Sequence, residues 1–481
     1  MCVIIKLSGQ NCTYMTGGIY LQRDIWAIGH KVELSEMLSG REKRAGRQKV
    51  ILDLYRRTLI CFTLNIAGPI KVSALTKELF LRGYDQIRHA LTSYGLPILF
   101  SELSPHSYGY EGYWVVDADS LLVKKLMSEI EDGSPVGRLY DIDVLWPDGE
   151  KVSRLDTGRQ ARSCIICGAP ASDCASRRLH TVEELQEKTF RVIIDSIRHE
   201  GMQPRLIGRL CRLAMLHEVY TTPKPGLVDL NNNGSHTDMD VKLFEKSAKT
   251  VEMYFTHAVE CGLMWSSISA RDVLSKLRPL GIQAEEDMFA ATGGVNTHKG
   301  LIFSLGIICC AIGHILGRHE RLTVDRLLTR SGEIAAPALA NDLRDLPPYE
   351  KMTAGQREYS EYGISGIRGE AASGFQSVRR IGLPILEQLM DDGESFHDAG
   401  RVALLHLIVN VNDTNMIKRC GRSGFRKIQD RIADHLDSCR SVSEDYLIEL
   451  DRRFIEMNAS PGGCADLLAI CYFLHMLTEL V

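Results

Sequence analysis

The sequence predicts a multidomain protein in which an N-terminal α+β domain precedes an all-α helical domain. At 481 residues the chain is longer than one ordinary domain. Runs of β-forming residues that end in turn residues occur only before about residue 180. After His180 almost every segment has the apolar spacing of an amphipathic helix. We therefore expect a poorly ordered extension at 1–30, a first domain at 31–181 and a second domain at 182–481.

The first domain is expected to mix strands with helices. A basic helix is predicted at 39–55, with Ser39 as its cap, and a buried strand at 59–71 that ends in a Gly-Pro turn. Two further runs are rich in β-forming residues, 112–118 and 137–150. The second of them closes with the turn residues Pro147, Asp148 and Gly149. A nucleotidyltransferase-like arrangement is one alternative for this domain.

The second domain is expected to be a set of helices joined by glycine-containing loops. The most apolar stretch, 301–316, is shorter than the ~20 residues that a spanning helix needs, and it contains His314. We therefore expect a buried core helix there and no membrane partner. Helical spacing is found at 206–218, 241–262, 301–317, 376–390, 398–411, 424–438 and 443–457.

The composition excludes several classes of protein. With 44% hydrophobic and 25% charged residues the chain is globular. A net charge of -4 argues against a nucleic-acid partner bound through bulk charge. The start of the chain lacks the pattern of a secretory signal. The 14 cysteines are scattered among helical patterns, which favours reduced thiols and a cytoplasmic location.

Two carboxylates in the first domain suggest a magnesium site. Asp141 and Asp143 stand two residues apart on a predicted strand, so both side chains project from the same face. Such a pair can share Mg²⁺, which neutralises phosphate oxygens during displacement. Gly137 and Arg138 just upstream suit a nearby phosphate. The alternative is an ordinary pair of surface carboxylates.

A cysteine-rich segment follows, in which Cys164, Cys167, Cys174 and His180 form the pattern C-x2-C-x6-C-x5-H. Four soft ligands with a C-x2-C knuckle indicate structural zinc. The alternative is three thiols in a local core beside a surface histidine. The flanking arginines form either a solvated basic face or a site for phosphate or an acidic protein partner; they are Arg159, Arg162, Arg177 and Arg178.

Polar loops recur in the second domain. In TTPKPGLVDLNNNGSHTDMD (221–240), prolines stiffen the backbone and glycines permit bends, which is typical of a binding loop. In the loop at 285–306, backbone amides at a helix start favour an anion, although this is not the ordinary P-loop pattern. Further polar loops lie at 363–374, 412–415 and 460–466. The candidate residues are Glu218, Lys224, Asp229, Asn232, His236, Asp238, Asp287, Asn296, His298, Lys299, Arg368, Glu370, Asn415 and Arg419.

Caps and helix connections would explain any one of these loops, but five in one helical domain favour a site. Together they offer carboxylates for a metal and a general base, Lys and Arg for phosphates, and amides for a purine edge. That set suits a magnesium nucleotide and a second anionic substrate.

Two families resemble the two parts of the chain. Residues 36–185 resemble the phosphoribosyl-dephospho-CoA transferases, the citrate lyase holo-acyl-carrier-protein synthases, through SGREKRAGRQ, NIAGPIK, GRLYDIDVL and CIICGAPASDCASRRLH. Residues 205–481 resemble the triphosphoribosyl-dephospho-CoA synthases through HEVYTTPKPGLVD, GSHTDM, DMFAATGGVNTHKGLIFSLG, RGEAASG, DTN and SPGGCAD. The whole chain is similar to a fusion of the two.

The resemblance implies two consecutive reactions. The second domain would join ATP to 3′-dephospho-CoA and release adenine, giving 2′-(5″-triphosphoribosyl)-3′-dephospho-CoA. The first domain would transfer this group to a serine of the citrate lyase acyl carrier subunit and release diphosphate. Asp141 and Asp143 with Mg²⁺ would act in the transfer. For the glycosyl step the expected pool of base, stabiliser and Mg²⁺ ligands is Glu218, Asp229, Asp238, Asp287 and Glu370.

Two rival interpretations remain at this point. The same chemistry could serve malonate decarboxylase, whose prosthetic group is similar. Alternatively, the second domain is a catalytically silent nucleotide-binding scaffold that accompanies a zinc knuckle. Release of adenine from ATP that depends on dephospho-CoA would distinguish an enzyme from a scaffold.

Overall fold

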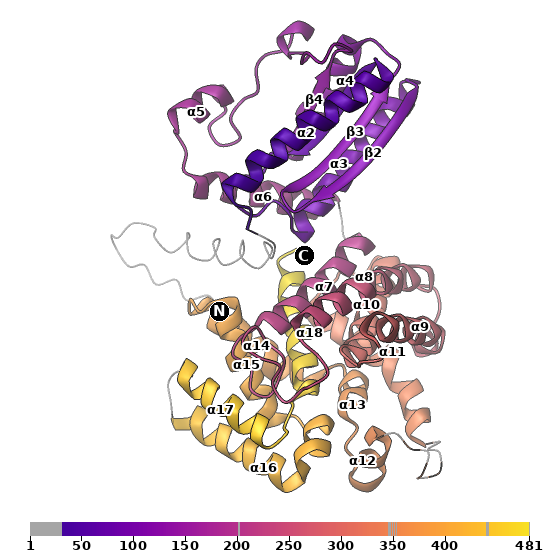
Figure 1. The fold of residues 1–481 in the computed structure, drawn as a ribbon. Helices are drawn as coiled ribbons and strands as arrows, with labels where there is room; N and C mark the ends of the chain where they lie inside the picture. The colour runs from indigo at the N-terminus through magenta and orange to yellow at the C-terminus, as the bar shows by residue number, and fades with distance from the viewer. Residues whose placement is uncertain are drawn as a thin grey trace, which may run out of the picture. The chain divides into compact units, whose positions relative to one another are not determined.

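The structure is a computed structural model that describes residues 31–200, 203–344, 348, 350, 352, 354–438 and 442–480. The predicted extension at 1–30 lies outside the described residues. The chain divides into two compact units, Met1–Gly201 and Met202–Val481 (Figure 1). Helix α6 (Val182–Glu200), which we had assigned to the second domain, falls in the first unit. Arg82 Nη1 donates to Ser196 Oγ of this helix over 2.8 Å, which connects α6 to the rest of the first unit.

The first unit is built on a four-stranded antiparallel sheet, which confirms an α+β domain. The strands run in the order β2-β3-β1-β4, where β1 is Thr58–Leu64, β2 Ile98–His106, β3 Gly109–Val116 and β4 Tyr140–Leu145. The register of β1 against β4 places Cys61 opposite Asp143 and Thr63 opposite Asp141. Strand β1 ends at Leu64 instead of residue 71, and β4 occupies only the middle of the strand predicted at 137–150.

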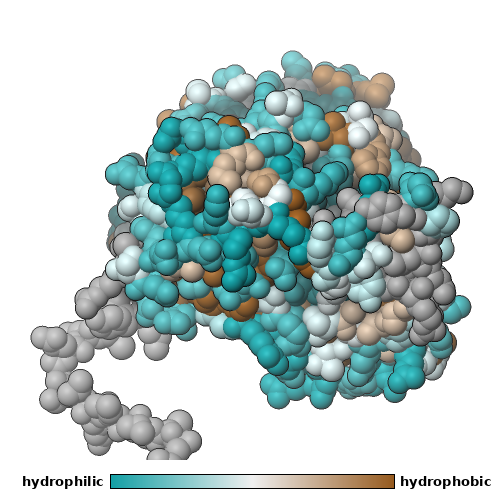
Figure 2. Space-filling model, turned by 90° about the horizontal axis from the view of Figure 1, so that it is seen from below, coloured by the Kyte–Doolittle hydropathy of each residue, from teal (hydrophilic) through white to brown (hydrophobic). Residues whose placement is uncertain are grey.

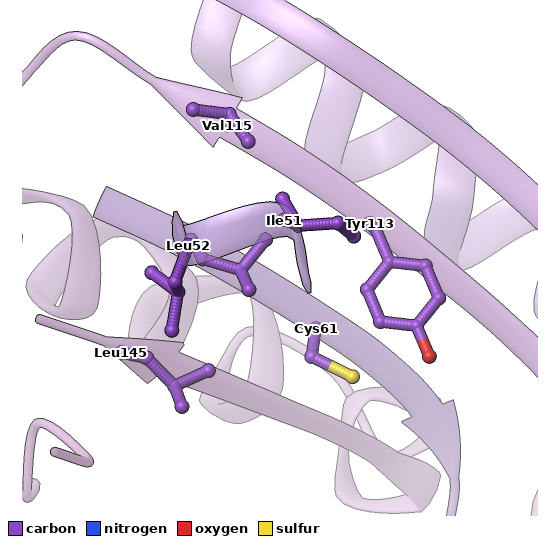
Figure 3. Packing of buried hydrophobic residues seen from close by; sticks show 7 residues of the cluster. Ile51, Leu52, Cys61, Tyr113, Val115 and Leu145 are labelled. Atoms are coloured by element: carbon purple, nitrogen blue, oxygen red, sulfur yellow. The ribbon is translucent and has the colours of Figure 1, made fainter. Parts of the chain in front are cut away.

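Helices cover both faces of this sheet. On one face, Ile51 and Leu52 of α2 (Leu34–Tyr55) pack against Cys61, Tyr113, Val115 and Leu145 (Figure 3). On the other face, the Phe62 ring of β1 stacks 4.7 Å from the Phe80 ring of α3 (Ala74–Ser93). The predicted cap of α2 is wrong, because the helix begins before Ser39, and Glu33 stands at its N-cap. The sequence analysis also missed α3, α4 (Ser120–Asp132) and β2.

Short elements complete the first unit. The 3-10 helices η1 (Val136–Leu139) and η2 (Leu155–Thr157) flank β4, and α5 (Ala171–Arg177) follows the first two cysteines of the C-x2-C pattern.

The described residues of the second unit contain helices and no strand, as predicted. Several helices, including α9, α11 and α18, were not foreseen. The elements are α7 (Pro204–Tyr220), α8 (Val241–Met264), η3 (Ala270–Asp272), α9 (Val273–Thr292), α10 (Lys299–Gly317), α11 (Val324–Arg344), α12 (Ala354–Tyr362), α13 (Gly366–Ser373), η5 (Val378–Gly382), α14 (Leu383–Asp391), α15 (Phe396–Asn410), α16 (Thr414–Ser438), α17 (Glu444–Glu456) and α18 (Gly462–Thr478).

Helix α10 forms the core of the second unit. It is long and apolar enough to cross a membrane, but 78% of its most apolar window is buried inside the protein, in agreement with the predicted core helix. It packs against α8 at close range, because a Cβ on Gly262 would lie 2.1 Å from the Cys310 carbonyl oxygen. The face of the protein in Figure 2 is mostly hydrophilic, and apolar residues appear on it in small patches.

We predict that Gly262→Ala destabilises the second unit by about 2 kcal/mol or more, because the new methyl group would overlap the α10 backbone. Gly424→Ala is the matched control, since its nearest neighbour would be the Cys420 Cβ at an ordinary 3.4 Å. Thermal and denaturant unfolding of the full chain measures both. Equal midpoints for the two variants would contradict the close packing of α8 and α10.

Candidate active sites

A cavity of about 280 Å³ opens among the polar loops of the second unit. Its walls come from the end of α7, the loop at 221–240, the starts of α8 and α10, and the starts of α16 and α18. Segments that are far apart in the sequence therefore meet around one space. Nine of the predicted residues line it: Glu218, Lys224, His236, Asp238, Asn296, His298, Lys299, Asn415 and Arg419.

A buried ion pair lies on one wall. Lys224 is only 1% exposed, and its Nζ donates to Glu218 Oε1 at the end of α7. Burial raises the pKa of Glu218, while the charge and hydrogen bond of Lys224 act in the opposite direction. The lysine is thus held at a fixed place in the cavity wall, where its charge is little screened by solvent.

Two buried carboxylates hold the loop at 221–240 in place. Asp229 accepts the backbone N–H groups of Lys224 over 2.8 Å, and of Asn231 and Asn232 over 2.8 and 3.1 Å. Asp451 of α17 accepts Gly226 N over 2.8 Å and Asn232 Nδ2 over 2.9 Å. Asp229 and Asn232 shape the loop through these bonds and do not line the cavity, and their predicted site roles stay predictions.

His236 and Arg419 support each other at another wall. Arg419 Nη2 donates to His236 Nδ1 over 3.2 Å, so the Nε2–H of His236 donates to Ser460 Oγ over 2.8 Å. Burial, together with the charge of Arg419, lowers the pKa of His236. Arg419 also donates to the Ser235 carbonyl over 2.8 Å, which leaves part of its guanidinium available for a ligand.

His298 is held as a neutral donor that faces the cavity. Thr297 Oγ1 donates to Ser247 Oγ over 2.7 Å, so the hydrogen of Ser247 is left for His298 Nδ1, also 2.7 Å away. The ring hydrogen therefore lies on Nε2, which is buried and has no hydrogen-bond partner. Burial, and then the charge of Lys224, lowers the pKa of His298 to about 3. A substrate atom can accept the hydrogen bond that Nε2 offers.

The start of α10 lies between His298 and a second ion pair. Asn296 Oδ1 accepts the backbone N–H of Lys299 over 3.2 Å, which fixes the entry to the helix. Lys299 Nζ pairs with Glu285 Oε2 over 2.7 Å, and its side chain is 52% exposed. Lys299 can therefore exchange this partner for a ligand.

The sequence analysis missed two carboxylates near the starts of α16 and α18. Asp413 is buried and accepts the backbone N–H groups of Asn415, Met416 and Cys464 over 2.8, 3.1 and 3.0 Å. It ties the start of α16 to the start of α18. The second of these carboxylates is Asp466, which lies in the motif SPGGCAD.

Asp466 faces the cavity, and its carboxylate has no hydrogen-bond or ion-pair partner among the described residues. It lies on the cavity wall, and a Cβ on Gly300 would meet its Oδ2 at 1.8 Å, so the glycine makes room for it. Burial raises the pKa of Asp466 well above its usual value, and the nearby charges of Glu218 and Asp413 raise it further. A carboxylate in this environment is a strong candidate for a general base.

Three other predicted residues do not line this cavity. Asp287 is exposed on α9 and accepts Gln283 Nε2 over 3.1 Å. Glu370 accepts Ser377 N over 3.1 Å and Ser377 Oγ over 2.6 Å, so it fixes the turn after α13. Arg368 lines a separate cavity. Asp287 and Glu370 thus form hydrogen bonds within their own segments and lie outside this cavity, and their predicted catalytic roles stay predictions.

In the first unit, Asp141 and Asp143 lie on β4 and point to the same face, as predicted. Both are half-buried. Asp143 Oδ2 pairs with Lys151 Nζ over 2.6 Å, and Asp141 lies 3.5 Å from Arg162 Nη1 and from Thr63 Oγ1. The pair can therefore offer oxygen ligands to a cation, with cations of the protein close by.

The predicted arginines divide into two groups. Arg138 donates to the Ser163 carbonyl and lies 3.6 Å from Asp132, so protein groups occupy much of its guanidinium. Arg159 and Arg162 likewise form ion pairs with acidic residues of α4. Arg177 and Arg178 are exposed beside the cysteine cluster. Only this second group forms the solvated basic face that we considered.

The predicted zinc ligands converge. One ligand atom from each of Cys164, Cys167, Cys174 and His180 lies within 4.8 Å of the others. Cys167 Sγ is 3.4 Å from Cys174 Sγ and 3.3 Å from His180 Nε2. Burial acts to raise the pKa of Cys164, but hydrogen bonds from Cys167 and Ile166 outweigh it and lower the pKa. The donor set and its spacing fit a tetrahedral zinc ion. None of the described cysteines forms a disulfide bond.

Comparison with known proteins identifies both units. Residues 204–481 match the family described as ATP:dephospho-CoA triphosphoribosyl transferase, and residues 32–196 match that described as apo-citrate lyase phosphoribosyl-dephospho-CoA transferase. The chain belongs to the fusion of these two transferase families. Protein CitXG of Haemophilus influenzae is 35% identical over 92% of this chain and 96% of its own length. Protein CitXG of Leuconostoc mesenteroides is 30% identical over 94% of this chain and 99% of its own.

Shorter relatives match the second unit alone. The 2-(5″-triphosphoribosyl)-3′-dephosphocoenzyme-A synthase of Pectobacterium atrosepticum is 40% identical over 54% of this chain and 86% of its own length. The fusion family therefore joins two transferases, one of which also occurs as a separate protein.

We predict that acid destabilises the second unit partly through His298. Its pKa of about 3 in the folded protein lies below its usual value of 6.5. Between these values the unfolded chain binds a proton that the folded protein does not, so the free energy of unfolding falls as the pH decreases through this window. Denaturant unfolding at several pH values should show a shallower decline for His298→Gln than for the unsubstituted protein. Equal pH dependence would contradict the neutral, buried histidine.

Proposed function

We propose that the protein makes and attaches the prosthetic group of citrate lyase. The second unit converts ATP and 3′-dephospho-CoA to 2′-(5″-triphosphoribosyl)-3′-dephospho-CoA and adenine. The first unit transfers this group to a serine of the apo acyl carrier subunit and releases diphosphate. The observation that carries the proposal is the cavity in which a buried lysine, a neutral histidine donor and an unpartnered carboxylate face one space.

The first reaction breaks the glycosidic bond of ATP. The 2′-hydroxyl oxygen of dephospho-CoA attacks C1 of the ATP ribose, the C–N bond to adenine breaks, and adenine leaves with the bonding electrons and takes up a proton. Asp466, whose raised pKa favours proton uptake, accepts the proton of the attacking hydroxyl. Glu218 remains paired with Lys224 and adds negative charge near the developing oxocarbenium ion.

The triphosphate must be held still in this reaction, because none of its bonds breaks. Lys224, Lys299 and Arg419 supply the positive charge on the cavity wall. His298 donates from Nε2 to a phosphate oxygen or ribose oxygen without carrying a charge itself. Asn296, Asn415 and His236 complete the polar wall, and Asp238, with a 62% exposed side chain, lies at its rim.

The second reaction would occur in the first unit. Asp141 and Asp143 would hold Mg²⁺, whose chemistry is to neutralise the phosphate oxygens during displacement. Two carboxylates on one face, half-buried and near Lys151 and Arg162, support this assignment. A nucleotidyltransferase-like arrangement of the sheet would be consistent with such a site. We place the protein in the cytoplasm, where its described cysteines stay reduced.

Two variants should separate the activities. Asp141→Asn should abolish modification of the acyl carrier subunit and leave adenine release near normal, because the carboxylate pair serves only the transfer. Asp466→Asn should lower adenine release at least about 100-fold through loss of the base, and should still modify the carrier when the triphosphoribosyl product is supplied. Adenine chromatography and mass spectrometry of the carrier measure the two reactions.

Asp392→Asn, on an exposed residue after α14, is the control and should leave both reactions unchanged. ATP hydrolysis to ADP without adenine would instead identify a different enzyme, and absence of any reaction would favour a silent scaffold. Modification of a malonate decarboxylase carrier in preference to that of citrate lyase would move the proposal to that pathway.

We further propose that Cys164, Cys167, Cys174 and His180 bind one structural zinc ion. Elemental analysis of the purified chain should give about one zinc per chain, and Cys174→Ser should reduce it strongly, since a ligand is lost. Cys420→Ser, in the second unit, should keep full zinc content. Well below one zinc per chain in the unsubstituted protein would refute the site.

A further inference from the structure

A second cavity, of about 290 Å³, borders the first in the helical unit. Lys299 lines both cavities, and its ion pair with Glu285 stands where they adjoin. The walls of the second cavity are mainly apolar and come from α9, α10 and α11, with Leu277, Ile302, Phe303 and Leu339 among them. The cations Arg278, Lys299 and Arg368 also line this cavity, and its apolar part suits a flat, uncharged ring.

A hydroxyl group is built into this apolar wall. Tyr254 of α8 is only 9% exposed and lines the cavity. Two glycines on neighbouring helices make room for its Oη: a Cβ on Gly306 would lie 2.1 Å from it, and a Cβ on Gly281 would lie 3.3 Å from it. None of the residues described by the structure forms a hydrogen bond with this hydroxyl. The hydroxyl lines the cavity without a partner among these residues, so it can donate to a ligand there.

Charged side chains also line the second cavity, among them those of Glu285 and Arg368. Glu285 offers carboxylate lone pairs beyond the one that Lys299 occupies. Arg368 of α13 lines the cavity and is half-buried, and within the described part of the chain its guanidinium has neither a hydrogen bond nor an ion pair. A planar guanidinium in this position can stack on an aromatic ring.

The size of the first cavity requires further space for substrates. Sites for small molecules usually measure ~300–1,000 Å³, and the first cavity lies at the low end although the reaction brings two nucleotides together. Both substrates carry an adenine ring, which has apolar faces, an amino group that donates, and ring nitrogens that accept. The apolar walls, together with the Glu285 carboxylate and the Tyr254 hydroxyl, match this chemistry.

We propose that the second cavity binds the adenine ring of a nucleotide substrate, and we call it the adenine cavity. Glu285 accepts from the exocyclic amino group, the Tyr254 hydroxyl donates to a ring nitrogen, and Leu277, Ile302 and Phe303 cover the ring. The triphosphate or diphosphate then extends past Lys299 into the first cavity. This inference rests on the proposed function, because ATP and dephospho-CoA are the two sources of the ring.

The test uses free adenine as the probe on the full chain. Tyr254→Phe removes only the hydroxyl and should weaken adenine binding about 3- to 10-fold in calorimetry, as one hydrogen bond predicts. Tyr220→Phe is the matched control, since that hydroxyl donates to Glu245 outside either cavity, and it should bind adenine as the unsubstituted protein does. Unchanged adenine affinity in Tyr254→Phe overturns the proposal.

Steady-state inhibition by adenine assigns the source of the ring. If adenine competes with ATP, and Tyr254→Phe raises the KM for ATP, the adenine ring of ATP binds in the adenine cavity. If adenine competes with dephospho-CoA, and the variant raises the KM for dephospho-CoA, the adenine ring of dephospho-CoA binds there. If adenine competes with neither substrate, the proposal is overturned. A raised KM for dephospho-CoA with unchanged adenine affinity in Tyr254→Phe also overturns it, because the cavity would then bind the pantetheine arm of dephospho-CoA instead of its adenine ring. If the unsubstituted protein releases no adenine from ATP, the proposed function fails instead.

Discussion

Buried carboxylates that accept backbone N–H groups are the interaction on which the helical unit depends. Asp413 takes three such groups and joins the starts of α16 and α18. Asp229 takes three within one loop, and Asp451 attaches that loop to α17. Each bond satisfies a backbone donor that has no helical partner at that point, so losing one carboxylate would leave several buried donors unsatisfied. These bonds hold the loops rigidly against the helices that carry them.

This rigidity allows the site to hold groups in unfavourable states. Lys224 is almost fully buried, His298 keeps an unpaired Nε2, and Asp466 has no partner among the described side chains. Burying these groups costs free energy, and a substrate that supplies partners for His298 and Asp466 recovers part of it. An interior arranged before the substrate arrives stabilises developing charge without reorganisation at the moment of reaction. The carboxylates that support the loops are thus different from Asp466, which faces the cavity.

The two units use opposite means of placing their carboxylates. In the first unit, strand periodicity alone puts Asp141 and Asp143 on one face, and the sheet register sets them opposite Thr63 and Cys61. In the second unit, no local periodicity relates Glu218 to Asp466, which lie in α7 and α18. Only the packing of those helices brings the two carboxylates near each other. The chain thus contains one candidate site whose carboxylates are neighbours in sequence, in the first unit, and one whose carboxylates come from distant helices, in the second unit.

The sequence by itself determined the division into an α+β part and a helical part, the face shared by Asp141 and Asp143, the set of three cysteines and one histidine that converge, and most of the cavity residues. These features depend on period, spacing and quoted motifs, which are local properties. Tertiary structure alone decided which carboxylate of the polar loops faces the cavity without a protein partner among the described residues. Asp229, Asp287 and Glu370 look equivalent to Asp466 in sequence, but the first three bind their own loop or helix. Asp466 is left exposed to the cavity because Gly300, 166 positions earlier in the chain, has no side chain to fill that space.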